Sequence, residues 1–414
     1  MNLKVIVLAI LIVVYLHSLF LDLVRCRSAR NPVPRNVADV YDGDTYQKWK
    51  TYHGEKARWR ILSAAASFLI DFVLMAVNAY AAFAASGLFA EDVYAQGVAV
   101  MVLSAMANLL LIPFAWHDIM HIEARYGFNR MGIKTFWGDQ IKSFLISLGL
   151  MCGISCLLTW AHGAMGDWLI LALAVILTLF ALFFTFLYPF FSKIFNRFTP
   201  LPDGELKAGI TALLEKNGYR VRAIQVMDAS RRSTKSNAYF TGFGKMKTIV
   251  LYDTLIEAMT TDEILAVFAH EMGHGLHRDT LKNQIMSFTQ MAVLGLLAWG
   301  TLRYPEIFRS FGFKGVNYGF AVLLIMSVEF ALISPLFGLV MNWFSRRAEY
   351  RADEQAVREG YGEALIHALK KLARENFADL SPSPLLVALE YSHPTLSQRI
   401  EAIESMEAKK LAQN

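Results

Sequence analysis

The stretch "FAHEMGHGLHRD", residues 268–279, places two histidines four positions apart, with a glutamate directly after the first. Positions i and i+4 of an α-helix lie on one face about one turn apart, so His270 and His274 would present both imidazoles together. That spacing suits two corners of a tetrahedral zinc site. Glu271 lies about 100° further round the helix, where it would reach a water molecule rather than the metal. The stretch therefore predicts two zinc ligands and a general base.

The residues before the histidines predict a well-formed helix. Thr260 and Glu263 have the spacing of a capping box, which closes the first turn of a helix. The alternative to a catalytic site is a helix with solvated histidines or with a structural metal. The motif by itself does not separate these possibilities, because a short motif is a hypothesis until its setting fits. The apolar face of this helix would be formed by Ile264, Leu265, Phe268 and Met272.

A candidate third ligand lies in the stretch "NWFSRRAEYRADEQAV", residues 342–357. Glu349 would complete a His₂Glu set, which leaves one metal position open for water. Glu349 and Asp353 are i and i+4 on a predicted helix, where two carboxylates repel each other unless an outside partner compensates. A ligating imidazole also needs a partner for its other nitrogen, and Asp353 or Asp279 would provide one.

The remaining histidines and cysteines are expected to have structural roles. His117 and His121 are also i and i+4, but no glutamate follows the first, so we expect polar contacts rather than a second metal. His277 is expected to lie beside the ligands or in solvent, because two histidines and a glutamate already complete the set. Cys152 and Cys156 lie in an apolar run, where free cysteine packs as a small hydrophobe.

Composition indicates a membrane protein. Of the 414 residues, 55% are hydrophobic and only 18% are charged, whereas soluble domains have about 45–50% and about 25%. The mean hydropathy is +0.37. The formal net charge of +5 is small for this length and gives no support for nucleic acid as a partner. The lipid bilayer is the partner that the composition indicates.

Seven apolar segments are long enough to cross a membrane, which takes about 18–20 residues of helix. The first is followed by Arg25 and Arg27 rather than by a cleavage site, so we interpret it as an anchor. The segments are residues 3–24, 61–87, 97–117, 142–163, 168–191, 285–303 and 319–343. They divide the chain into a membrane region (1–191), a polar catalytic part with a small α+β unit (192–284), two further spans (285–343) and a C-terminal part (344–414).

Basic residues in the short loops predict the orientation. The loop between the first two spans is rich in lysine and arginine, whereas "LFAEDVYAQG" and "HGAMGDW" have none. The positive-inside rule therefore places the N-terminus outside and the catalytic part in the cytoplasm. Arg303, Arg309 and Lys314 are the exception, because they fall on the predicted outer side.

Two carboxylates, Asp71 and Glu329, fall inside predicted spans. A carboxylate in the membrane is expensive and faces protein or water rather than lipid. These residues therefore predict either a polar, water-filled interior or hydrogen bonds between helices.

Together these motifs resemble those of the integral-membrane CAAX prenyl protease family of type 1. Members of this family are zinc metallopeptidases with about seven transmembrane helices that enclose a chamber and a small gluzincin-like α+β protease domain. The resemblance extends from about residue 30 to about residue 405. It rests on the stretches "YGFN", "FNRFTPLPDGELK", "SNAYFTGFGKMKTIVLYDTL", "HEMGH", "SRRAEYRAD" and "SHPTLSQRI".

The resemblance implies roles for individual residues. His270, His274 and Glu349 would hold one zinc ion, and Glu271 would be the general base. His393 would stabilise the transition state, with Arg399 nearby, although His393-Pro394 by itself indicates a turn that starts a helix. Asn237, Ala238 and Tyr239 would lie on an edge strand that pairs with an extended substrate. Asp279 stands where some members have histidine, which leaves its role open.

The expected function is hydrolysis of peptide bonds near the C-terminus of isoprenylated CAAX proteins or peptides. The membrane would be a bacterial cell membrane or that of the endoplasmic reticulum. One alternative is a membrane quality-control zinc protease without prenyl selectivity. Another is a channel or transporter with a structural zinc, which would have a closed site of four protein ligands.

Overall fold

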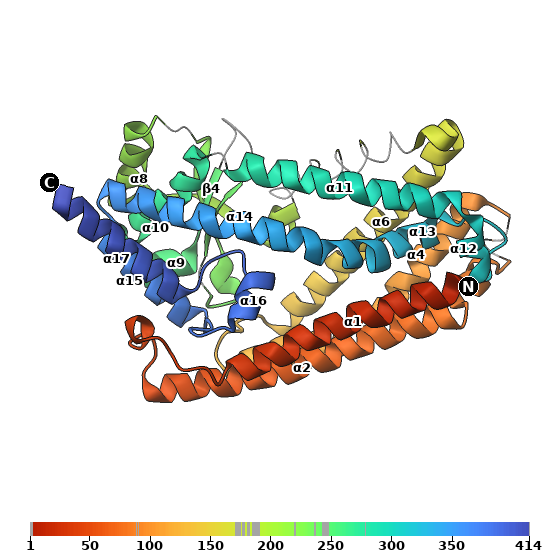
Figure 1. The fold of residues 1–414 in the computed structure, drawn as a ribbon, viewed down its shortest axis with the longest axis horizontal. Helices are drawn as coiled ribbons and strands as arrows, with labels where there is room; N and C mark the ends of the chain where they lie inside the picture. Colours follow the sequence, from red (N-terminus) through yellow and green to blue (C-terminus); the bar gives the residue numbers. More distant parts are fainter. Residues whose placement is uncertain are drawn as a thin grey trace.

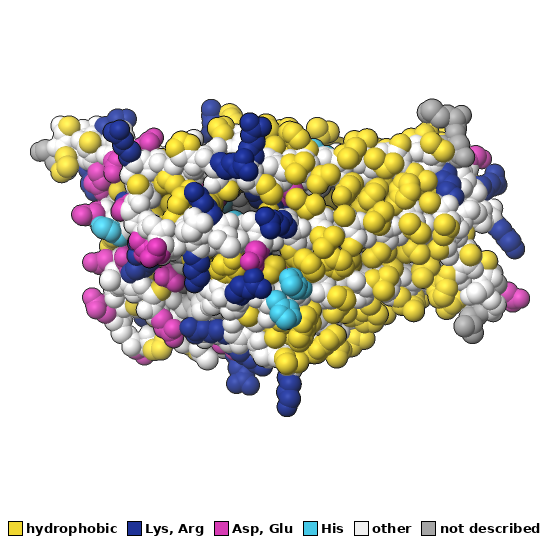
Figure 2. Space-filling model, turned by 90° about the horizontal axis from the view of Figure 1, so that it is seen from below, with side chains coloured by type: hydrophobic (Ala, Val, Ile, Leu, Met, Phe, Trp, Pro, Cys, Tyr) yellow, Lys and Arg dark blue, Asp and Glu magenta, His cyan; other side chains and the backbone are white. Residues whose placement is uncertain are grey.

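The molecule is elongated, with long helices along its length and a small sheet with shorter helices at one end (Figure 1). This computed structural model describes residues 3–413 except 88, 90, 170–174, 176–178, 180–182, 184–190, 219–220, 236, 242–247 and 278. Figure 2 shows one face of the molecule, on which the side chains of the helical part form an apolar surface that gives way to charged side chains toward the end with the sheet. The structure therefore has an apolar half and a polar half.

The helices of the apolar half are α1 (Leu3–Ser28), α2 (Gly43–Ala76), α3 (Ala79–Ala84), α4 (Val93–Leu109), α5 (Ile112–Trp116), η2 (His117–Glu123), α6 (Ile133–Met165), η3 (Gly166–Trp168), α11 (Asp279–Arg303), α12 (Pro305–Ser310), α13 (Tyr318–Leu324), η6 (Ile325–Glu329) and α14 (Phe330–Glu359). The elements of the polar half are η1 (Arg35–Val37), β1 (Phe198–Pro200), α8 (Glu205–Lys216), β2 (Ala223–Met227), η4 (Ala229–Arg231), β3 (Ala238–Thr241), β4 (Thr248–Tyr252), α9 (Asp253–Ala258), α10 (Thr261–Leu276), α15 (Gly362–Glu375), α16 (Pro384–Leu389) and α17 (Leu396–Gln413).

Most of the predicted spans correspond to long helices. In the described part of the chain, five helices are long and apolar enough to cross a membrane. A sixth span is formed if α4 and the helix at 112–123, which meet at a 41° bend, count as one. The seventh predicted segment, residues 168–191, lies for the most part outside the described residues.

Two of these helices extend well beyond the apolar segments that predicted them. Helix α2 begins at Gly43, although its apolar segment begins at residue 61, and α14 continues to Glu359 beyond residue 343. Lys, Glu, Arg and Ala are good helix formers, so a helix need not end where its apolar part ends. As a consequence, α14 carries Glu349 on the same helix that runs through the apolar half.

Close backbone contact holds part of the apolar half together. A Cβ atom added to Gly319 would lie 2.1 Å from the carbonyl oxygen of Gly97, so α13 and α4 touch at these two glycines. Small residues allow such contacts between membrane helices. Glu329 accepts a hydrogen bond from the hydroxyl of Thr301 on α11. Of the two predicted settings for this carboxylate, the structure therefore shows a hydrogen bond between helices.

The sheet has the strand order β1-β2-β4-β3, in which β2 and β4 are parallel and the other pairs are antiparallel. Ala238 of β3 pairs with Leu251, and Tyr239 pairs with Val250, so β3 is an edge strand. Strand β1 was not predicted, because three residues that end in a proline have the composition of a turn. Residues 243–247, whose sequence FGKMK predicts a turn between two strands, lie outside the described residues.

Helix α10 connects the sheet to the long helices. Its predicted apolar residues Ile264, Leu265 and Phe268 are buried against Ile249 and Leu251 of β4. Its last residue, Leu276, is followed within three residues by the first residue of α11. The histidine motif therefore lies at the point where the polar half joins a membrane helix.

Candidate metal centre

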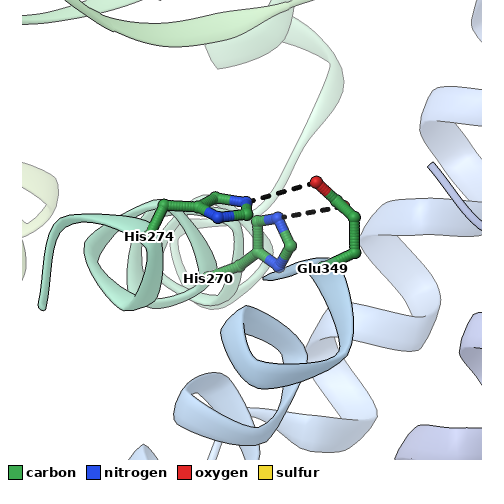
Figure 3. A group of neighbouring side chains, drawn as sticks. All are labelled: His270, His274 and Glu349. Carbon is green, nitrogen blue, oxygen red and sulfur yellow. Dashed lines mark ion pairs between the residues drawn. The ribbon is translucent and has the colours of Figure 1, made fainter. Parts of the chain in front are cut away.

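Three side chains from two helices converge in the polar half (Figure 3). His270 and His274 come from α10, and Glu349 comes from α14. The Nε2 atom of His270 lies 3.6 Å from Glu349 Oε2, and Nε2 of His274 lies 3.3 Å from Oε1. Each residue offers one ligand atom, and these atoms all lie within 4.8 Å of one another. The structure therefore brings together the three ligands that the sequence predicts.

The dimensions of this group fit a metal ion. Bonds of about 2.0–2.2 Å in a tetrahedral zinc site separate neighbouring ligand atoms by about 3.3–3.6 Å. The two nitrogen–oxygen distances above fall in this range. Glu349 is 2% exposed, and its Oε2 has no hydrogen bond to any described residue. A buried carboxylate oxygen without a hydrogen bond is costly, and a metal ion bound directly to it would add to the compensation that the charge of Arg399 provides at 3.3 Å.

Both imidazoles are oriented by carboxylates behind them. His270 Nδ1 lies 2.8 Å from Asp353 Oδ1, and His274 Nδ1 lies 3.3 Å from Asp279 Oδ2. A carboxylate on Nδ1 holds the proton there and leaves Nε2 as the nitrogen that binds a metal. The structure places both predicted carboxylates in this position, one for each histidine.

Arg399 of α17 is buried behind the first histidine. Its Nε donates to Asp353 Oδ2 at 2.9 Å, and its Nη1 lies 3.3 Å from Glu349 Oε2 without hydrogen-bonding geometry. Burial has the largest single effect on the pKa of Arg399 and lowers it, but the charges of Asp353, Glu349 and Glu271 and the hydrogen bond to Asp353 together raise it by more. This cation is the outside partner that compensates the two carboxylates on one face of α14.

Asp279, behind the second histidine, is held by two cations. Arg351 Nη2 donates to Asp279 Oδ1 at 2.9 Å, and Lys282 Nζ donates to the same oxygen at 3.1 Å. Burial raises the pKa of Asp279, but these cations and His274 lower it by more, so the net shift is downward. The contact of Arg351 was not predicted. The only sequence signal for it is the unfavourable pair that Arg351 forms with Arg347, four residues earlier.

The basicity of His274 reflects the carboxylates around it. Burial has the largest single effect on the pKa of His274 and lowers it, while the hydrogen bond and charge of Glu349 oppose that effect. Glu271 and Asp279 act in the same direction, so the pKa lies above its usual value. A site that favours positive charge on its own imidazole is also one that attracts a cation.

A glycine allows the two helices of the site to meet. A Cβ atom added to Gly273 would lie 2.8 Å from the Cα of Ala352 and 3.0 Å from the Cβ of Gln355. Glycine inside a helix costs about 1 kcal/mol relative to alanine, so its presence needs a reason. Here the reason is the close approach of α10 and α14, and sequence reasoning overlooked it.

The predicted start of α10 is present. Thr260 Oγ1 accepts a hydrogen bond from Glu263 N at 3.3 Å, and Glu263 Oε2 accepts one from Thr260 N at 2.8 Å. This is the reciprocal pair of a capping box. It fixes the residue at which α10 begins, and with it the face of the helix on which His270 and His274 lie.

His393 reaches the site from the loop between α16 and α17. Its Nδ1 lies 2.9 Å from Glu349 Oε1, while its side chain is 61% exposed. Its Nε2 has no hydrogen bond to any residue that the structure describes. His277 differs, because its Nδ1 donates to the carbonyl of Gly273 at 2.9 Å, within its own helix.

Asn237, Ala238 and Tyr239 lie at the predicted edge of the sheet. The carbonyl of Asn237 accepts a hydrogen bond from Tyr252 N at 3.1 Å, which continues the pairing of β3 with β4. On its other side β3 has no partner among the strands of the described residues. An edge strand of this kind is a place where an extended peptide can add as a further strand.

His117 and His121, the other histidine pair, do not join this site. Their rings stack on each other at 5.2 Å, and the ring of His117 lies 4.1 Å from that of Trp59. In the described part of the chain, the only group of three that could hold a metal is His270, His274 and Glu349. The contacts that the structure shows for His117 and His121 are therefore ring contacts, whereas polar contacts were expected.

Comparison with known proteins places this architecture in a family. Residues 200–407 match peptidase family M48, and residues 22–197 match the "CAAX prenyl protease N-terminal, five membrane helices" family. The chain is 32% identical to the CAAX prenyl protease 1 homolog of Oryza sativa subsp. japonica, covering 98% of each chain. It is 29% identical to CAAX prenyl protease 1 of Saccharomyces cerevisiae, covering 91% of this chain and 90% of that protein.

The fold is also similar to a solved structure. The crystal structure of Ste24p from S. mikatae superposes with a TM-score of 0.90 at 27% sequence identity, covering 98% of this chain and 99% of that one. The sequence match and the fold match extend over nearly the whole chain. The chain belongs to peptidase family M48, as a multi-pass membrane metalloendopeptidase of the CAAX prenyl protease type.

Proposed function

We propose that this protein is a zinc-dependent endopeptidase that hydrolyses peptide bonds near the C-terminus of isoprenylated CAAX proteins or peptides. The observation that carries the proposal is the buried His₂Glu group, in which each imidazole has a carboxylate on Nδ1 and directs Nε2 toward Glu349. The prenylated substrate class is supported by the names of the relatives, which are CAAX prenyl proteases. The sequence match to them extends over at least nine tenths of each chain.

His270, His274 and Glu349 would hold the zinc ion, with Asp353, Asp279 and Arg399 as positioning residues behind them. When bound, zinc supplies a Lewis acid that polarises a carbonyl group and makes water nucleophilic at neutral pH. Three protein ligands leave a position open, as catalytic rather than structural zinc sites do. This argues against a channel or transporter with a structural zinc.

Glu271 follows His270 on α10 and is partly exposed. We assign it as the general base, which takes the proton of the attacking water and gives it to the leaving amine. His393 would donate a hydrogen bond from Nε2 to the developing oxyanion, because its Nδ1 is occupied by Glu349. Both assignments rest on position and on the family resemblance.

The substrate would bind as an added strand on β3. Asn237, Ala238 and Tyr239 would pair with its extended backbone, and β3 contacts α10, which carries the histidines. Strand addition is driven by backbone hydrogen bonds, so it tolerates varied side chains. Selectivity for the substrate would then come from the prenyl group rather than from the peptide.

We also propose that the polar half faces the cytoplasm and that the N-terminus lies outside. The basic residues of the loop between α1 and α2 support this orientation by the positive-inside rule. The membrane would be a bacterial cell membrane or that of the endoplasmic reticulum.

Purified protein incubated with a farnesylated CAAX peptide tests the proposal. We expect one cut near the C-terminus, loss of cleavage with a chelator and recovery on addition of zinc, each followed by mass spectrometry. The same peptide without the farnesyl group is the control. Equal cleavage of both peptides would favour a quality-control protease without prenyl selectivity. No chelator-sensitive cleavage of either would overturn the enzymatic assignment.

A further inference from the structure

A cavity lies away from the metal centre, at the end of the helical hairpin formed by α1 and α2. Its volume is about 500 Å³, and it is lined by the end of α1, the middle of α2 and Asp379 from the segment after α15. None of the metal-site residues lines it. Six cationic side chains face it, namely Arg25, Arg30, Lys50, Lys56, Arg58 and Arg60.

Half of these cations are already paired within the protein. Arg25 and Arg60 contact Asp22 at 2.6 and 2.7 Å, and Lys56 contacts Asp118 at 2.7 Å and Glu123 at 2.8 Å. These pairs hold the walls of the cavity in place.

The other three cations have no carboxylate partner. No Asp or Glu among the described residues lies within ion-pair distance of Arg30, Lys50 or Arg58. Asp379 is the only acid in the lining, and it accepts hydrogen bonds from Ser381 and Ser28. The cavity therefore has an excess of positive charge that the protein leaves uncompensated.

The surroundings of the cavity are those of a membrane boundary. Phe20 and Leu23 on α1 are 49% and 55% exposed, and Leu62 on α2 is 51% exposed. They lie within one to two turns of cavity residues on the same helices. Figure 2, which views the face that α1 and α2 form, shows basic side chains gathered where the apolar surface ends.

We infer that this cavity binds the phosphate of an anionic phospholipid, with the acyl chains lying along the exposed apolar side chains of α1 and α2. Arginine forms charge-assisted hydrogen bonds to phosphate oxygens, and basic pockets between membrane helices bind anionic headgroups. A free phosphate ion would share the charge contacts, but it would leave Phe20, Leu23 and Leu62 without a partner. The site is independent of the proposed catalytic function.

The test uses the full-length protein in detergent and a titration with phosphatidylglycerol, followed by native mass spectrometry. Phosphatidylcholine with the same acyl chains and inorganic phosphate are separate arms. The variant changes Arg30, Lys50 and Arg58 to Gln. The control variant changes Arg27, Arg35 and Lys48 to Gln, which removes the same charge from the same region but from residues outside the cavity lining.

We expect the cavity variant to bind phosphatidylglycerol about 100-fold more weakly, since each basic residue contributes about a factor of five. The control variant should stay within about threefold of the wild type. Equal binding of phosphatidylcholine, or an equal loss in the control, would overturn the site. Inorganic phosphate that binds as tightly as phosphatidylglycerol would overturn the lipid assignment. Should the triple variant not fold, Arg58→Gln alone carries the test, with an expected loss of about fivefold.

Discussion

Two pairs of histidines, each four residues apart on a helix, make different contacts in this protein. His270 and His274 lie edge to face, 4.9 Å apart, and direct Nε2 toward Glu349. His117 and His121 are stacked on each other, and the first also packs on Trp59. The i,i+4 spacing therefore offers two ligands, but a third residue from another helix decides whether they form a site.

The residue after the first histidine differs in the same way. Asp118 follows His117, and its carboxylate is occupied by Lys56 at 2.7 Å. Glu271 follows His270, and no described residue forms an ion pair with it. A carboxylate already bound to a lysine is a structural group, whereas an unpaired one beside a metal site is available as a base.

Replacement of one histidine in each pair should give the largest contrast. His274→Ala removes a metal ligand, so we expect zinc binding and peptide cleavage to fall below detection. His121→Ala should keep zinc and retain activity within about threefold of the wild type. Metal analysis and the farnesylated-peptide assay measure both. Loss of zinc in His121→Ala would show that the two pairs share a metal-binding role.

Replacement of the acidic residue that follows each pair's first histidine should separate a base from a structural carboxylate. Glu271→Gln keeps the size of the side chain, so we expect zinc to stay bound while kcat falls by about 10²–10⁴-fold. Asp118→Asn should leave the kcat of the folded fraction within about threefold. Cleavage by Glu271→Gln at the wild-type rate would exclude Glu271 as the general base.

Removal of the carboxylate behind His270 should weaken the site without abolishing it. Asp353→Asn removes the negative charge beside His270 Nδ1 and the charged partner of Arg399. We therefore expect metal affinity to fall by about 10- to 100-fold. A competition titration against a zinc-binding dye gives the affinity. Glu354→Gln, at an exposed neighbour that pairs with Arg358, is the matched control. An unchanged affinity in Asp353→Asn would contradict the positioning role.

Removal of the cap of α10 should have the smallest effect. Thr260→Ala loses one side-chain hydrogen bond to the helix N-terminus, so we expect a cost of about 1 kcal/mol in stability. The unfolding temperature should fall by about 1–3 °C. Thr211→Ala, in the interior of α8 and away from any cap, is the control. A similar loss in both variants would show that the capping box adds nothing specific.

Local signals in the sequence account for much of the correct prediction. Five of the seven predicted spans, the capping box and the one-face placement of His270 and His274 all depend on residues within one helix. Apolar length, cap spacing and helical period act over a few turns at most, so one segment contains the whole signal. Helices α2 and α14 are longer than the apolar segments, because polar helix formers continue both helices past the membrane segments.

The third candidate ligand of the site was also predicted from the sequence, by the chemistry of metal ligands. Glu349 was predicted as a ligand for two reasons. Two histidines need an acidic third ligand in a His₂Glu site, and Glu349 would otherwise repel Asp353 one turn away on the same helix. The family resemblance added His393 and the edge strand at Asn237; in the structure His393 Nδ1 lies 2.9 Å from Glu349 Oε1, and Asn237 directly precedes the edge strand β3. Their catalytic and substrate-binding roles stay predictions.

Only the tertiary structure decided which helices meet and at what register. Gly273 lets α10 lie against Ala352 of α14, and this contact brings Glu349 to the histidines. The partners in the site are far apart in the chain, 83 residues for His270 and Asp353 and 129 for Arg399 and His270. Side-chain packing and burial select such pairs, and neither can be predicted from the pattern of neighbouring residues in the sequence. For that reason the sequence predicted the ligands, while the fold decided that a third candidate ligand meets one histidine pair, and that none among the described residues meets the other.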